Sequence, residues 1–127
     1  MIAIEEIPDS DALYYRVHIN LVKSAGGKLG PNCFRDPGGG MSTDWSKYAT
    51  PEQTRSAKGA ENAPKYGIAR LPVGVVRQIE QLSVVHAPIE GNDAHIHVLG
   101  LSTDELLTQQ RSELYDACGR AWLIPPL

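Results

Sequence analysis

The chain has 127 residues, a formal net charge of −3 at pH 7 and a hydrophobic fraction of 42%. The length predicts one domain with its own core, and the negative charge excludes bulk DNA binding through a basic face. No apolar run is long enough to span a bilayer, and the acidic start MIAIEEIPDSD is unlike a signal peptide. Two cysteines, Cys33 and Cys118, are too few for a disulfide framework. We therefore expect one cytoplasmic domain, residues 1–127, without membrane contact.

The N-terminal half carries one strand signal and one helix signal. ALYYRVHIN (12–20) alternates between apolar and polar residues, which is typical of a half-buried strand. Residues 23–41 contain six glycines and predict a loop. Thr50 and Gln53 form a capping box around a proline, so we expect a short helix that stops near Gly59.

The C-terminal half predicts two more strand regions and two helices. YGIARL predicts a strand and PVGVVRQIEQL a helix of two to three turns, while LSVVHA and AHIHVLG predict an antiparallel hairpin. Ser102 and Glu105 form a second capping box, and helical spacing continues to Gly119. The tail AWLIPPL should be an extended sheet edge or a docked strap. The fold class is therefore α+β, with a mainly antiparallel sheet, a long C-terminal helix and an extended tail.

Three of the four histidines lie in the segment HAPIEGNDAHIHVLG, between His86 and Gly100. On a strand, His95 and His97 point to the same side. The hairpin register decides whether His86 joins them, because a slip of one residue sends it to the opposite face. The sequence leaves this register open.

The first hypothesis for these residues is a polar pocket that binds or acts on a phosphate-containing ligand, namely RNA or a nucleotide. His86 and His95 would be the acid/base pair, because the ordinary pKa of imidazole lies near neutral pH, and Arg16 would contact the anion. An enzyme of this kind would be a histidine-dependent phosphodiesterase or nuclease. Lys28 is a further candidate cation. The candidate ligand-binding residues are His18, Arg35, Ser42 and Asp44.

Two other interpretations of the histidines stay open. His86, His95 and His97 could form a three-histidine zinc site, which is the one cofactor that the sequence suggests. Alternatively, the rings could be hydrogen-bonded structural groups with no reaction at all. Asp44 also has a second interpretation, as the N-cap of a helical turn in WSKYA.

The segments YYRVHIN, CFRDPGGGMSTDWSKYATPEQT and SVVHAPIEGNDAHIHVLGL together resemble a loose family of small uncharacterised bacterial proteins with no established activity. The first-strand arginine and the Ser-Thr segment are more distantly similar to the opening of ADP-ribosyltransferase folds, without a catalytic glutamate motif downstream. The resemblance to the bacterial family implies importance without a role for Arg16, Phe34, Ser42, Asp44, His86 and His95.

A different class of function is a non-catalytic interaction module, such as one half of a bacterial toxin–antitoxin, defence or regulatory pair. Its contact groups would be Trp45, Tyr48, Trp122 and the proline-rich tail, since aromatic residues dominate interface hot spots. A protein partner is therefore a second expectation beside the nucleotide or RNA ligand.

Overall fold

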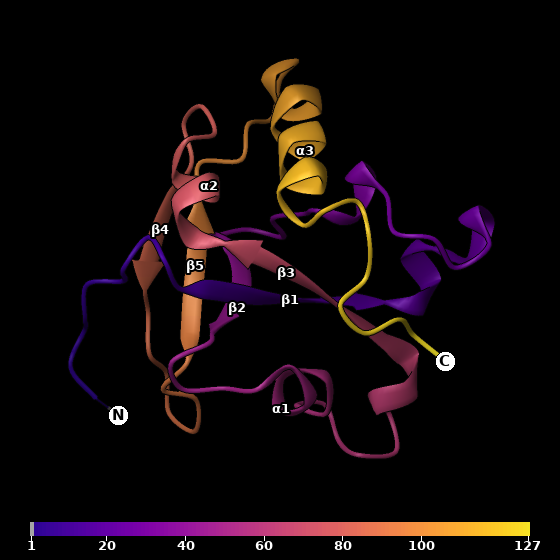
Figure 1. Cartoon of the computed structure of the whole chain (residues 1–127), viewed down its shortest axis with the longest axis horizontal. Helices are drawn as coiled ribbons and strands as arrows, with labels where there is room; N and C mark the ends of the chain where they lie inside the picture. Colours follow the sequence, from indigo (N-terminus) through magenta and orange to yellow (C-terminus); the bar gives the residue numbers. More distant parts are fainter. Residues whose placement is uncertain (1) are drawn as a thin grey trace.

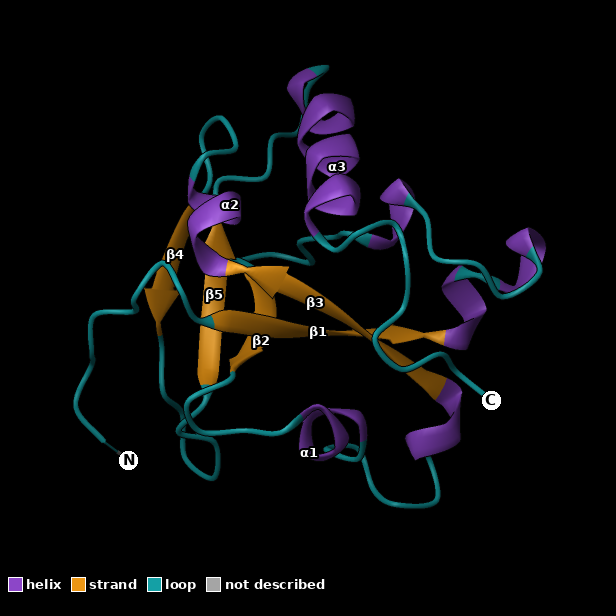
Figure 2. Cartoon of the chain, viewed as in Figure 1, coloured by secondary structure: helices purple, strands orange, loops and turns teal. Residues whose placement is uncertain are grey.

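The computed structural model describes residues 2–127 as one five-stranded antiparallel sheet with helices on both faces (Figures 1 and 2). The strand order is β3-β1-β2-β5-β4, and every neighbouring pair is antiparallel. The molecule is therefore a small α+β domain, as predicted. The strands are β1 (Ala12–His18), β2 (Met41–Trp45), β3 (Tyr66–Pro72), β4 (Ser83–His86) and β5 (His95–Leu99).

The helices divide between the two faces of the sheet. Helices α2 (Val73–Arg77) and α3 (Leu106–Ala117) lie over one face, and α1 (Pro51–Arg55) lies over the other (Figure 1). Within residues 2–127, no helix combines the length and the apolar character needed to cross a bilayer. Single turns of 3-10 helix lie in the loops at Ile19–Leu21, Lys23–Ala25, Pro31–Cys33 and Ala63–Lys65.

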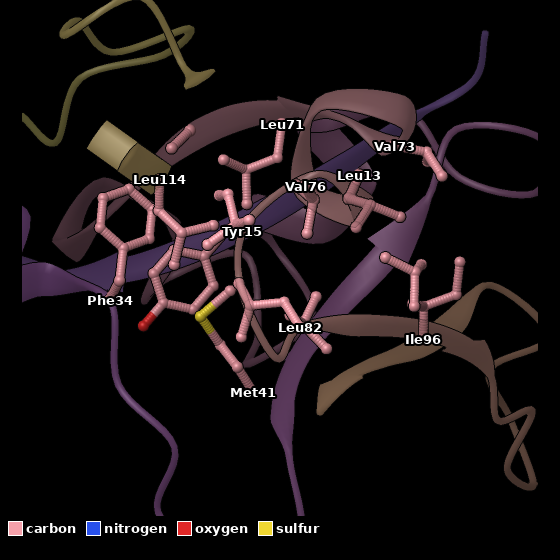
Figure 3. Packing of buried hydrophobic residues seen from close by; sticks show 14 of the residues in the cluster. Leu13, Tyr15, Phe34, Met41, Leu71, Val73, Val76, Leu82, Ile96 and Leu114 are labelled. Atoms are coloured by element: carbon pink, nitrogen blue, oxygen red, sulfur yellow. The ribbon is translucent and has the colours of Figure 1, made fainter. Parts of the chain in front are cut away.

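Alternate side chains of β1 separate a core face from a polar face, which confirms the predicted strand. Leu13 and Tyr15 are buried on the α2 and α3 side, where they belong to one cluster with Phe34 and Leu114 (Figure 3). Each buried side chain of this size contributes roughly 1.5–3 kcal/mol. The opposite side of the sheet, which carries Arg16, is called the polar face below.

Strand β2 was not predicted, because it follows the glycine-rich loop at once. Asp44 pairs with Tyr14 of β1 and with His95 of β5, so it lies inside a strand and does not cap the turn that follows. The expectation of a helix N-cap at Asp44 is therefore wrong. Pairing on both sides places these five residues near the centre of the sheet, and such long-range pairing leaves no mark in the local sequence.

The helix limits differ from the prediction at two places. Helix α2 ends at Arg77, and the positive φ of 71° at Gln81 is incompatible with continued helix. Helix α3 begins at Leu106 without the predicted Ser102–Glu105 capping box. Its first amide is bound instead by the carboxylate of Asp104, to which the hydroxyl of Ser102 donates.

The predicted hairpin is present, and its register separates the histidines. His86 lies opposite Ile96, and Val84 lies opposite Val98. Because side chains alternate, His86 points to the core face with Ile96, while His95 and His97 point to the polar face. The three imidazoles therefore do not share a face.

The C-terminal segment docks along the outer edge of β3, as expected for the extended tail. Ile68 donates its amide to the carbonyl of Ile124 at 2.8 Å and accepts from Leu123 at 2.8 Å. The indole of Trp122 lies over Gly67, where a β-carbon would come within 2.5 Å of the ring. The close contact requires a residue without a side chain at this position.

The substitution Gly67→Ala should therefore displace this tail. We expect a loss of about 1–3 kcal/mol in the free energy of unfolding, as for other overpacked sites, measured by urea denaturation. The double variant Gly67→Ala, Trp122→Ala should show less than the sum of the two single losses, because the nearer clash partner is gone and Cδ of Pro126 at 2.8 Å is the one that remains. Additive losses would contradict this account of the contact.

Candidate functional site

An open groove of about 920 Å³ lies over the polar face, between α1 and the loop that joins β4 to β5. Strands β1, β2 and β5 form its floor. Of the residues predicted as site residues, the groove brings together Arg16, Arg35, Ser42, Asp44 and His95. It is called the polar groove below.

His95 and Ser42 form a hydrogen-bonded pair on the floor of the polar groove. They lie diagonally across the β2 and β5 ladder, with the Oγ of Ser42 at 3.2 Å from Nε2 of His95. Nδ1 of His95 lies 2.8 Å from the carbonyl oxygen of Ala87. A carbonyl oxygen only accepts, so the neutral ring carries its proton on Nδ1 and leaves Nε2 to accept from the serine hydroxyl.

Asp44 positions the walls of the groove. Its buried carboxylate accepts from Oγ1 of Thr54 in α1 at 2.7 Å and from Nδ2 of Asn92 at 2.9 Å. Both carboxylate oxygens are therefore engaged by the protein, one by each wall. Asp44 holds α1 and the hairpin loop against β2, a role different from the predicted contact with ligand.

Three cationic and three anionic side chains line the groove. Arg16 donates to the carbonyl oxygen of Thr54 at 3.0 Å, and its guanidinium lies 5.5 Å from the ring centre of Tyr66. Arg35 donates from Nε to the carbonyl oxygen of Asn32 at 3.0 Å. The charged lining residues are Arg16, Arg35, Lys58, Asp44, Glu90 and Asp93. Because the signs balance, the position of each charge matters more than a bulk field.

His86 is a structural residue in the core and does not line the polar groove that contains His95. It is 1% exposed, Nδ1 accepts from the amide of Glu5 at 3.0 Å, and Nε2 lies 2.8 Å from the carbonyl oxygen of Asp93. Its ring packs edge-on against Trp45 with centroids 5.0 Å apart. Both nitrogens are thus engaged by main chain, and the expected acid/base pair of His86 and His95 is not formed.

His18 and His97 lie outside the groove lining. His18 accepts the amide of Asn20 at 3.1 Å and packs edge-on against Tyr66. His97 is beside His95, with ring centroids 4.6 Å apart. Partial burial lowers the pKa of His97, and the neighbouring charge of His95 lowers it further.

The proposed zinc site is not assembled either. His86 faces the core while His95 and His97 face the polar side. In the part of the chain that the structure describes, no three histidine, cysteine or acidic side chains are grouped as a metal site.

Aromatic residues assigned to the interaction module mostly pack inside the fold. Trp45 is 1% exposed, and Trp122 is half-buried with Nε1 donating to the carbonyl oxygen of Gly27 at 3.0 Å. Tyr48 is 39% exposed and lies on the rim of the polar groove. Only Tyr48 of these three therefore offers an exposed ring.

Sequence reasoning missed three partners of the site, which are Thr54, Asn92 and the main-chain carbonyl of Ala87. Thr54 could have been considered from its place on the capped helix. Asn92 looked like an ordinary turn residue, and a main-chain acceptor has no residue signal at all.

Comparison with protein-family models, with curated proteins and with solved structures finds no match to this chain. The resemblance to small uncharacterised bacterial proteins stays a prediction.

Removal of the two hairpin histidines should affect stability unequally. His86→Ala leaves two main-chain groups unpaired and a void beside Trp45, so we expect a loss of about 3 kcal/mol in unfolding free energy. His95→Ala removes one bond at the groove and should cost about 1 kcal/mol or less. Urea denaturation of both variants measures the difference, and equal losses would contradict the structural role of His86.

The lowered pKa of His97 gives a second check on the polar face. An NMR titration should place its midpoint below the ordinary histidine value, because burial and His95 both disfavour the charged ring. In His95→Asn the midpoint should rise, since the like charge is removed while burial remains. A midpoint that stays fixed in this variant would show that the two rings do not interact.

Proposed function

We propose that the polar groove binds a phosphate-containing ligand, a nucleotide or a short single-stranded RNA, and that His95 supplies acid and base catalysis there. The observation that carries this proposal is the meeting of Arg16, Arg35, Ser42 and His95 in one groove. The four residues come from three strands, β1, β2 and β5, and from the loop before β2. The groove volume of about 920 Å³ is in the range of small-ligand sites.

Arg16 is suited to contact the anion. Its bond to Thr54 fixes one guanidinium nitrogen, and its guanidinium carbon lies 5.5 Å from the centre of the Tyr66 ring. A guanidinium fork matches phosphate oxygens in two parallel hydrogen bonds, and holding it in advance reduces the entropy lost on binding. Arg35, on the loop before β2, would add a second positive charge.

Two tyrosines support recognition of a nucleobase. Tyr14 and Tyr48 both line the groove, and the hydroxyl of Tyr48 is hydrogen-bonded to the carboxylate of Glu5. Bases that are not paired stack on aromatic rings in most single-strand binding proteins. A nucleotide has a base that can stack on an aromatic ring and a phosphate that can bind a cation, and the groove lining holds both kinds of side chain.

His95 would serve as base and acid in successive steps, because His86 is buried elsewhere. Its Nδ1 proton is held by Ala87, so Nε2 can take a proton from a hydroxyl and return it to a leaving oxygen. The same nitrogen faces Ser42 in the free protein. A phosphodiesterase or nuclease activity would follow from this cycle.

Arg16 and Arg70 form a matched pair to test binding. Both lie on the polar face, on adjacent strands, but Arg70 is exposed and outside the groove lining. We expect Arg16→Gln to weaken binding of AMP and of a short single-stranded RNA about tenfold or more, since a hydrogen bond to a charged group contributes about 1.5–3 kcal/mol. Arg70→Gln should leave both affinities unchanged.

Isothermal titration calorimetry at fixed ionic strength measures these affinities, and the unfolding midpoint of each variant confirms that it is folded. Absence of binding by the parent protein would overturn the proposal. Equal weakening by the two variants would show that binding depends on surface charge and not on the groove.

A further inference from the structure

We propose that Ser42 is a nucleophile, activated by His95, that attacks the phosphorus of a phosphate ester bound in the polar groove. This inference rests on the proposed function, and it names the reacting group and the class of substrate. The sequence offers no nucleophile motif around Ser42, so its geometry alone supports the assignment.

The hydroxyl of Ser42, the imidazole of His95 and the carbonyl of Ala87 follow one another in a chain of two hydrogen bonds, as an activated nucleophile requires. The Oγ of Ser42 lies 3.2 Å from Nε2 of His95, and Nδ1 of His95 lies 2.8 Å from the carbonyl oxygen of Ala87. The carbonyl fixes the tautomer in which Nε2 can accept a proton. A nucleophile, a base and a third group that orients the base are the recognised signature of covalent catalysis.

The hydroxyl of Ser42 is not needed to hold the strand, in contrast to its neighbour. Thr43 points to the core face, is buried and donates to the carbonyl oxygen of Ile96 at 3.1 Å. Ser42 is exposed on the groove floor, and within residues 2–127 its one side-chain hydrogen bond is with His95. Its hydroxyl is therefore accessible to a ligand.

His97 keeps the surroundings of His95 free of added charge. It lies beside His95 and opposite Ser42 on the neighbouring strand. Burial first, and then the charge of His95, lower the pKa of His97 and favour its neutral form.

In the proposed first step, Oγ of Ser42 bonds to phosphorus while the bond from phosphorus to the leaving oxygen breaks. The hydroxyl proton passes to Nε2 of His95, and the protonated ring then gives it to the leaving oxygen. In the second step, the oxygen of a water molecule bonds to phosphorus as the bond to Oγ breaks. The water proton returns through Nε2 to Oγ, so solvent water is the one co-reactant and no electrons are exchanged.

A phosphorylating probe tests the nucleophile directly. We expect diisopropyl fluorophosphate to add one phosphoryl group to the full chain, releasing fluoride, and peptide mass spectrometry to place the group on Ser42. Ser42→Ala should abolish the adduct. Ser83→Ala is the matched control, because Ser83 is an exposed strand serine that points to the same face one strand beyond β5, outside the groove lining.

The variants His95→Gln and His95→Asn should slow labelling about a hundredfold, the lower end of the contribution expected from a general base. Thermal unfolding shows whether each variant is folded. Two variants are used so that the test remains possible if one of them does not fold. Labelling of Ser42 at an unchanged rate in a folded variant would overturn activation by His95. Labelling spread over other hydroxyls, or no labelling, would overturn Ser42 as the nucleophile.

Labelling of Ser42 and binding of the ligand are measured separately, so a failed nucleophile can be distinguished from a wrong ligand. Binding of AMP without labelling of Ser42 would leave the ligand groove in place and remove the nucleophile. Labelling of Ser42 in a chain that binds neither AMP nor the short single-stranded RNA would retain the nucleophile and overturn the proposed ligand.

Discussion

The pairing of His86 with Ile96 controls both the core and the polar groove. Ile96 and Val98 are fully buried on the core face, and each contributes roughly 1.5–3 kcal/mol by leaving water. A hairpin shifted by one residue would expose the partners of these side chains and bring His86 to the polar side. Burial of two aliphatic residues therefore determines which histidine is structural and which is available for chemistry.

The same residue type has two roles in this hairpin, and its surroundings decide which. His86 uses both ring nitrogens for main-chain groups of Glu5 and Asp93, so it joins segments that are far apart in sequence. His95 uses one nitrogen for Ala87 and directs the other at Ser42. The ring of His95 thus presents one nitrogen to the polar groove, whereas both nitrogens of His86 are bound to main-chain groups.

Short-range patterns in the sequence correctly predicted the helices and strands whose formation depends on nearby residues. The alternation in β1, the capping box at Thr50 and the glycine after α3 all act within a few residues, and the structure contains each of them. β2 was hidden because its pairing with β1 and β5 is long-range. The hairpin register was hidden because Val84 and Val85 lie on opposite sides of β4, so the sequence of that strand does not mark which face is buried. The prediction that His86 acts together with His95 depended on that register. The prediction for Asp44 depended on β2, which was not predicted.

The docked tail has a consequence for how copies of this sheet could meet. Ile124 covers part of the outer edge of β3, because both main-chain groups of Ile68 are paired with the docked tail. Among residues 2–127, no strand pairs with the outer side of β4, which is four residues long. β4 is therefore the more open edge, and two copies joined by β4 against β4 would be related by a two-fold axis. Such a pair would use the β4 edge of both copies and would place the tail-covered β3 edges at its two ends.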